Sequence, residues 1–86
     1  MTYSVEVVVC LKAAVNDPQG LVVRDGLRHL GFATVSSVRV GKHIEVELAA
    51  ADEESARDQV VGMCERLLRN PVIEEYRISG TRAVPD

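Results

Sequence analysis

Two histidines could serve as a catalytic base in this sequence, but neither lies beside a residue that could act as a nucleophile. His43 follows Lys42 in a turn where an anion could be held, but no Ser, Asp or Cys beside it would complete a nucleophile and base pair. His29 comes late in a helical pattern, where an imidazole near the negative end of the helix dipole needs no chemical role. The histidines therefore predict no catalytic centre.

The carboxylates that are neighbours in the sequence also have a structural explanation. Asp52, Glu53 and Glu54 come at the start of a helical pattern, where acidic side chains complement the helix dipole. Glu74 and Glu75 follow each other on a strand pattern, so they point to opposite faces. Neither group predicts an acid-base pair.

The two cysteines, Cys10 and Cys64, are too few for a disulfide framework and too far apart for zinc-ligand spacing. Each lies among apolar neighbours, which favours two buried, small hydrophobic side chains. A glycine-rich phosphate loop and a His-Glu-x-x-His helix are absent from the sequence. We expect no metal ligand, no cofactor-binding residue and no catalytic residue in this chain.

The most informative stretch is Asp17-Pro18-Gln19-Gly20, between an apolar run and a helical pattern. Asp accepts hydrogen bonds from backbone N–H groups at a helix start, Pro suits the first helical turn, and Gly allows the backbone to approach a neighbour closely. The stretch therefore predicts a strand-to-helix turn.

The spacing of apolar residues predicts six elements in the order strand, helix, strand, strand, helix, strand. Their ranges are Tyr3–Leu11, Leu21–Leu30, Val38–Val40, Ile44–Leu48, Asp52–Leu67 and Val72–Ile78. The two middle strands are expected to form a hairpin with the loop Gly41-Lys42-His43, in which Val40 pairs with Ile44 and Val38 with Val46. Residues 1–78 are expected to form one domain, and residues 79–86 a loosely ordered tail.

Two strand-helix-strand halves that interleave predict an α+β fold. It is a ferredoxin-like βαββαβ two-layer sandwich, a four-stranded antiparallel sheet with both helices on one face. This topology brings residues 12–20, 41–43 and 70–72 to one edge of the sheet. We call this edge the rim and expect it to dock a partner through Asp17, Pro18, Gln19, Gly20, Arg39, Gly41, Lys42, His43 and Pro71.

The sheet face opposite the helices is expected to be polar. It should carry Glu6, Val8, Cys10, Glu45 and Glu47, flanked by Arg39 and Arg77. An RNA-binding sheet needs aromatic side chains on its central strands, and carboxylates would repel phosphate. A solvated face and a subunit interface both remain open for this surface.

Size and charge limit the partners of the chain. Its 86 residues hold a single Phe, two Tyr and no Trp, so the core is small and self-association, as a homodimer or a tetramer, is expected. The net charge of -3 argues against a nucleic acid or an anionic membrane. With no leader or spanning segment evident, we expect a cytoplasmic protein.

Five segments together resemble the PurS family. They are Leu11-Lys12, Asp17-Pro18-Gln19-Gly20, Val38-Arg39-Val40-Gly41-Lys42, Met63-Cys64-Glu65-Arg66-Leu67-Leu68 and Asn70-Pro71-Val72-Ile73-Glu74-Glu75-Tyr76. The resemblance covers nearly the whole chain. It departs from the family where His43 replaces a frequent aromatic residue and where the chain continues through Gly80 to Asp86.

The resemblance implies a small subunit of the multi-chain phosphoribosylformylglycinamidine synthase of purine biosynthesis. In that assembly a glutaminase subunit releases ammonia, a large ATP-binding subunit performs the ligation, and PurS-like dimers bridge them. The chain would then be a non-catalytic adaptor that supports ammonia transfer. ATP, Mg and glutamine would be handled by the partner subunits.

Two alternatives come from other classes of protein. Asp17-Pro18-Gln19-Gly20-Leu21, followed by a helix and Gly31-Phe32, is also similar to ACT regulatory domains, which bind amino acids beside such a turn. An acylphosphatase of similar fold would require an Arg-bearing glycine loop that this sequence lacks. The adaptor ranks first, the ACT-like regulator second and the enzyme third.

Overall fold

Within residues 1–85, which the computed structural model describes, three strands form one antiparallel sheet in the order β2-β1-β3. The elements are β1 (Thr2–Leu11), α1 (Pro18–His29), β2 (Lys42–Ala49), α2 (Glu53–Met63), a π-helical turn η1 (Cys64–Leu68) and β3 (Glu74–Val84). Within residues 1–85, no helix combines the length and the apolar character that spanning a membrane requires.

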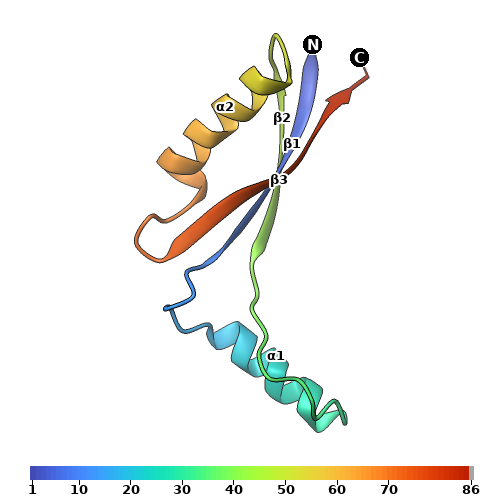
Figure 1. Cartoon of the computed structure of the whole chain (residues 1–86), viewed down its shortest axis with the longest axis vertical. Helices are drawn as coiled ribbons and strands as arrows, with labels where there is room; N and C mark the ends of the chain where they lie inside the picture. Colours follow the sequence, from blue (N-terminus) through green and yellow to red (C-terminus); the bar gives the residue numbers. More distant parts are fainter. Residues whose placement is uncertain (86) are drawn as a thin grey trace.

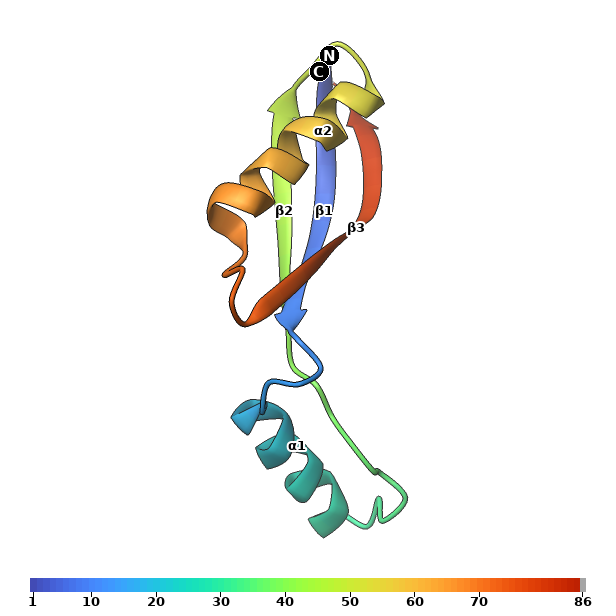
Figure 2. The same ribbon diagram turned by 60° about the vertical axis from the view of Figure 1, so that its left-hand side comes forward.

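The two halves of the molecule differ sharply in packing. Helix α2 lies against one face of the sheet, whereas α1 lies beyond the end of the sheet (Figure 1, Figure 2). The molecule is accordingly long and thin, with extents of 50 × 29 × 14 Å. Helix α1 and the chain that leads from it back to β2 thus form an arm, residues 18–41.

The core lies between β1 and the second helix. Its buried apolar residues are Tyr3, Val5, Val7 and Val9 of β1 and Ala56, Val60 and Cys64 of α2 and η1. Strand β1 is central and hydrogen-bonded on both sides, which explains why its inward side chains are fully buried. Cys64 is confirmed as a buried, small side chain, and burial raises the pKa of its thiol.

Both helix starts follow the sequence prediction. The Asp17 carboxylate caps α1 by accepting from Gly20 N at 3.0 Å, and Asp52 caps α2 by accepting from Ser55 N at 2.8 Å. Helix α1 ends at His29, and two residues beyond it Gly31 has a φ of 101°, the left-handed conformation that Gly adopts most easily. Phe32 N then donates to Leu27 O at 3.0 Å, which completes the expected helix stop.

The predicted four-stranded ferredoxin-like sheet is wrong. The segment before Lys42 lies outside the sheet, so Val38 and Val40 pair with no strand and the expected hairpin is absent from residues 1–85. The physical reason is that Gly41-Lys42-His43 does not reverse the chain. Strand β2 begins at Lys42, and the preceding residues continue away from the sheet toward α1 (Figure 1).

The last strand is longer than predicted. It continues beyond Ile78 to Val84, so residues 79–84 belong to β3 and not to a loose tail, while Asp86 lies outside the described residues. A register shift between Glu6 and Val7 places Gly80 opposite Glu6. The start of β1 and the end of β3 lie at the end of the sheet that is remote from α1 (Figure 1).

Candidate functional site

The chain leaves the sheet and returns to it at one place, where residues 12–20 contact residues 38–41. We call this contact the elbow. Its central group is the Asp17 carboxylate, which is buried and accepts from Val40 N at 2.8 Å through Oδ2 and from Gly20 N at 3.0 Å through Oδ1. The Val40 N–H, followed by that of Gly20, lowers the pKa of Asp17. One ionised side chain therefore ties the start of α1 to the returning chain.

Close backbone packing supports the elbow. A Cβ atom on Gly20 would lie 2.1 Å from Val38 O, and a Cβ atom on Gly41 would lie 2.8 Å from Val9 O. Only glycine fits such approaches. The prediction that Gly20 allows a close approach is thus confirmed, and the neighbour is the returning chain.

Arg39 serves the elbow and not the open face of the sheet, where the sequence analysis placed it. Its Nη2 donates to Lys12 O at 2.8 Å and Leu11 O at 3.3 Å, and its Nη1 donates to Val15 O at 3.1 Å. A guanidinium group can satisfy several carbonyls at once because it carries five N–H donors. Two sets of hydrogen bonds therefore hold the elbow. Asp17 accepts from a backbone N–H group of the returning chain, and Arg39 of the returning chain donates to backbone carbonyls of residues 11–15.

The loop before β3 joins the same region. Lys42 Nζ lies 3.3 Å from Glu74 Oε2, and Glu74 Oε1 accepts from Asn70 N at 2.8 Å. The Asn70 N–H and then Lys42 lower the pKa of Glu74. Lys12 Nζ donates to Pro71 O at 2.9 Å. Sequence reasoning placed Lys12 at this edge without naming it as a site residue. It missed Glu74, although strand alternation could have placed Glu74 on the same face as Lys42.

The predicted rim residues gather in part. A shallow hollow of about 190 Å³ is lined by Val9, Cys10, Leu11, Asp17, Gln19, Val40, Gly41, Lys42 and Glu74. A second, apolar hollow of about 410 Å³ beside it is lined by Pro18, Gln19, Val22, Val23 and Val40. His43 lies elsewhere, because it pairs with Val8 on the open face and its Nε2 is 3.9 Å from Glu6 Oε2.

The open face of the sheet carries the predicted charged ladder without Arg39. Glu6 lies opposite Glu45, Val8 lies between His43 and Arg77, and Cys10 lies opposite Glu75, with its Sγ 4.0 Å from Glu75 Oε1. These neighbours bring a thiol to a carboxylate and an imidazole to a carboxylate. Neither arrangement unites a nucleophile with a base and an oxyanion site.

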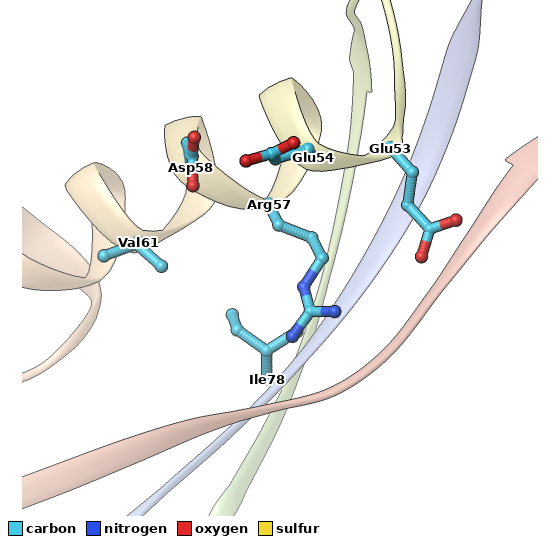
Figure 3. Close-up of a pocket in the computed structure, with 6 residues that line it drawn as sticks. All are labelled: Glu53, Glu54, Arg57, Asp58, Val61 and Ile78. Carbon is cyan, nitrogen blue, oxygen red and sulfur yellow. The ribbon is translucent and has the colours of Figure 1, made fainter.

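Another hollow, of about 460 Å³, lies between α2 and β3 and is lined by Glu53, Glu54, Arg57, Asp58, Val61 and Ile78. Figure 3 shows Arg57 reaching from α2 toward Ile78 on β3. These charged side chains can hold a charged partner surface. Among the described residues, no group of His, Cys, Asp or Glu is placed to hold a metal ion.

The glycines of α1 give a direct test of the elbow. Gly20→Ala should lower the free energy of unfolding by more than about 1 kcal/mol, because its Cβ would collide with Val38 O. Gly26→Ala is the matched control, since nothing lies within 4 Å of its added Cβ. This variant should raise stability by about 0.5–1 kcal/mol. Urea unfolding at one chain concentration measures both, and equal effects at the two positions would contradict the packing described.

Acid should weaken the elbow through Asp17. Because the folded-state pKa lies below the unfolded one, the stabilisation is complete above about pH 4 and is lost as the pH falls through the lowered value. Asp17→Asn should remove this part of the acid dependence, which urea midpoints measured from pH 7 to pH 3 will show. Glu74→Gln is the control. It removes a different carboxylate whose pKa is also lowered, and it should leave the acid dependence that Asp17 contributes unchanged.

Comparison with known proteins points to the PurS family. The model of the PurS family, described as phosphoribosylformylglycinamidine (FGAM) synthase, matches residues 4–82. The PurS subunit of this synthase from Synechocystis is 47% identical over 75 residues, which cover 87% of this chain and 75% of the relative. The PurS subunit from Bacillus subtilis is 45% identical over 78 residues, which cover 87% of this chain and 88% of the relative.

Solved structures of PurS proteins are similar to this chain along nearly its whole length. Thermus thermophilus PurS, at 34% identity, has a TM-score of 0.89 and covers 99% of this chain and 100% of its own. A chain of PurLQS from Thermotoga maritima, also at 34% identity, has a TM-score of 0.82 and covers 95% of this chain and 96% of its own. A score of 0.89 over nearly every residue requires the arm to project from the sheet in the Thermus protein too. The chain belongs to the PurS family.

Proposed function

We propose that this chain is a non-catalytic subunit of phosphoribosylformylglycinamidine synthase in purine biosynthesis. It joins a glutaminase subunit to the large ATP-dependent synthetase subunit in the cytoplasm and supports the transfer of ammonia between them. The observation that carries the proposal is the family match over residues 4–82 together with the likeness to a chain of a PurLQS assembly. The family match gives no support to the ACT-like alternative.

The hydrogen bonds and ion pairs that occupy the polar side chains at the elbow support a non-catalytic role. Asp17 and Arg39 are occupied by backbone groups, and Lys42 is paired with Glu74. Groups held in this way stabilise the shape of a surface and are poorly placed to exchange protons with a substrate. We therefore assign ATP, Mg and glutamine to the partner subunits.

The rim is our proposed docking surface. Asp17 and Gly20 are buried and support it from within, whereas Pro18, Gln19, Gly41, Lys42 and Pro71 are exposed at its surface. The apolar hollow beside Gln19 gives a partner side chain a place to be buried, which is the usual form of a binding anchor. His43 faces the open side of the sheet and would contact a partner only from that side.

Self-association is also part of the proposal. Helix α1 buries one residue, Gly20, while Val22 is 73% exposed, Leu30 is 76% exposed and Phe32 beyond the helix is 57% exposed. Apolar surface of this kind on a chain with a small core is typical of protein interfaces. We propose a homodimer as the unit that bridges the two partner subunits.

Reconstitution tests the adaptor role. Glutaminase and synthetase subunits from the same host, mixed without this chain, should lose most of their glutamine-dependent synthesis and retain synthesis from added ammonia. The physical reason is that the adaptor affects the transfer of ammonia and not the ligation. Assays of FGAM formation with glutamine or with ammonium chloride measure both. Turnover of ATP or glutamine by the isolated chain would contradict the proposal.

A charge placed at the rim should weaken binding of the partner subunits and leave the fold unchanged. Gln19→Arg should weaken capture of the two partner subunits by about fivefold or more, because the new charge must be desolvated beside an apolar hollow. Gln59→Arg, on the exposed side of α2, is the matched control and should bind normally. Titrated pull-downs measure both affinities, and circular dichroism checks the fold. Equal affinities for the two variants would move the docking surface away from the rim.

A further inference from the structure

The two lysines of this chain both contact the connection between η1 and β3. We call residues 70–73 the corner loop; it lies at the end of the sheet nearer to α1 (Figure 1, Figure 2). Lys12 Nζ donates to Pro71 O at 2.9 Å, and Lys42 Nζ lies 3.3 Å from Glu74 Oε2. We propose that the Lys42–Glu74 ion pair is a latch that positions the corner loop against the elbow, so that a partner meets both in one fixed arrangement. The inference deepens the proposed docking at the rim and rests on it.

The corner loop is closed by its own hydrogen bonds. Asn70 Oδ1 accepts from Val72 N at 3.0 Å, which is the usual turn made by an Asn side chain. Asn70 O accepts from Glu74 N at 2.8 Å, and Glu74 Oε1 accepts from Asn70 N at 2.8 Å. The loop therefore moves as a unit, and its place in the molecule depends on its contacts with its neighbours.

On one side the corner loop is anchored to the helical part of the chain. Tyr76 Oη donates to Glu65 Oε1 at 2.9 Å, and Arg69 forms an ion pair with the same carboxylate. The Arg69 guanidinium lies 5.1 Å from the centre of the Tyr76 ring, a favourable placement of a cation on an aromatic face. These contacts join η1 to β3 and involve no residue of the elbow.

On the other side the two lysines reach the corner loop from different segments. Lys12 belongs to the chain that leaves β1, and it bonds to the loop twice, from its backbone N to Ile73 O at 2.8 Å and from Nζ to Pro71 O. Lys42 begins β2, so it follows the chain that returns from the arm. A unit attached at one residue can still turn about it. The Lys42–Glu74 pair supplies a second point of attachment, which fixes the orientation of the loop.

The latch lies within the proposed docking surface. Lys42 and Glu74 both line the hollow of about 190 Å³ at the rim, together with Gln19 from the first turn of α1. Pro71 of the corner loop and Gln19 are both exposed. The latch therefore sets the spacing between two exposed parts of the rim. A surface that is held in its bound shape binds with a smaller loss of entropy.

The exposure of the latch argues against a role in global stability. The Lys42 side chain is 63% exposed, and that of Glu74 is 13% exposed. Ion pairs that water reaches contribute little to the free energy of unfolding, because solvation and side-chain entropy compete with the attraction. Loss of the latch should therefore appear in docking and in the local motion of the loop, and not in the unfolding midpoint.

A double-mutant cycle tests the latch on the full chain. Lys42→Gln and Glu74→Gln should each weaken capture of the glutaminase and synthetase subunits by about threefold or more, and the double variant by no more than either. Glu74→Gln keeps an oxygen for the Asn70 N–H, so it removes the ion pair and spares the closure of the loop. Titrated pull-downs measure the affinities. If Lys42 instead contacted a partner directly, Glu74→Gln would bind normally, and this result would overturn the proposal.

Matched variants separate the latch from charge and stability. Lys42→Arg keeps the cation and should bind within about twofold of the original chain. Glu75→Gln removes the same charge from the opposite face of β3, and Arg82→Gln removes a positive charge near the far end of β3. Both should bind normally. Urea unfolding should give nearly the same midpoint for every variant, since a large shift would show that the pair acts by holding the fold and would overturn the latch.

Hydrogen exchange reads the latch without any partner. The Lys12 amide, which donates to Ile73 O, should exchange about fivefold faster or more in Lys42→Gln and in Glu74→Gln, because the loop is then free to turn away. The Val72 amide is bonded inside the loop and should keep its rate. Unchanged exchange at Lys12 in both variants would overturn the proposal.

The outcome is separable from the proposed function. Equal capture of the partner subunits by the original chain and by all latch variants would overturn the latch and leave the adaptor role standing. Faster exchange at Lys12 in the variants of a chain that binds neither partner subunit would overturn the adaptor role and leave the latch within the chain standing.

Discussion

One buried carboxylate, that of Asp17, sets the shape of this molecule. It bonds to the first turn of α1 and to Val40 on the returning chain, so the helix and the strand-like segment must leave the sheet together. Arg39 strengthens the same contact from the opposite side through three carbonyl oxygens. Because both ends of the arm meet at this elbow, its direction is fixed by local bonds and not by burial of its apolar side chains.

That arrangement divides the chain into a part that buries its apolar side chains in a core and an arm that leaves them exposed. Strand β1 and α2 bury a small aliphatic core, whereas α1 leaves its apolar residues in water. Burial of a large aliphatic side chain contributes about 1.5–3 kcal/mol, so exposing several of them is a substantial loss for a domain of 86 residues. Association with another surface is the process that can recover this free energy, and it links the shape of the arm to a role in an assembly.

The sequence predicted the local structure well and the pairing of distant segments poorly. Caps at Asp17 and Asp52, the stop at Gly31 and the burial of Cys64 follow from chemistry within a few residues. The alternation of Val38 and Val40 predicted a strand, but these residues lie outside the sheet, because alternation within one segment does not specify a neighbouring strand. The tail was misjudged because residues 79–84 lack strong alternation, and their place in β3 depends on β1 beside them.

For the candidate site, too, sequence reasoning failed where contacts join distant segments of the chain. Convergence of Asp17, Gln19, Gly41 and Lys42 was predicted from a four-stranded topology that is wrong, yet the structure brings these residues around one hollow. Arg39 was placed on the wrong surface because its position assumed the hairpin. Its three bonds to carbonyls could not be inferred from spacing, since they join residues 11–15 to a segment that the predicted hairpin would have carried elsewhere. Charged groups that look available in the sequence are therefore used to hold the elbow, and we propose that the exposed residues around them contact other subunits.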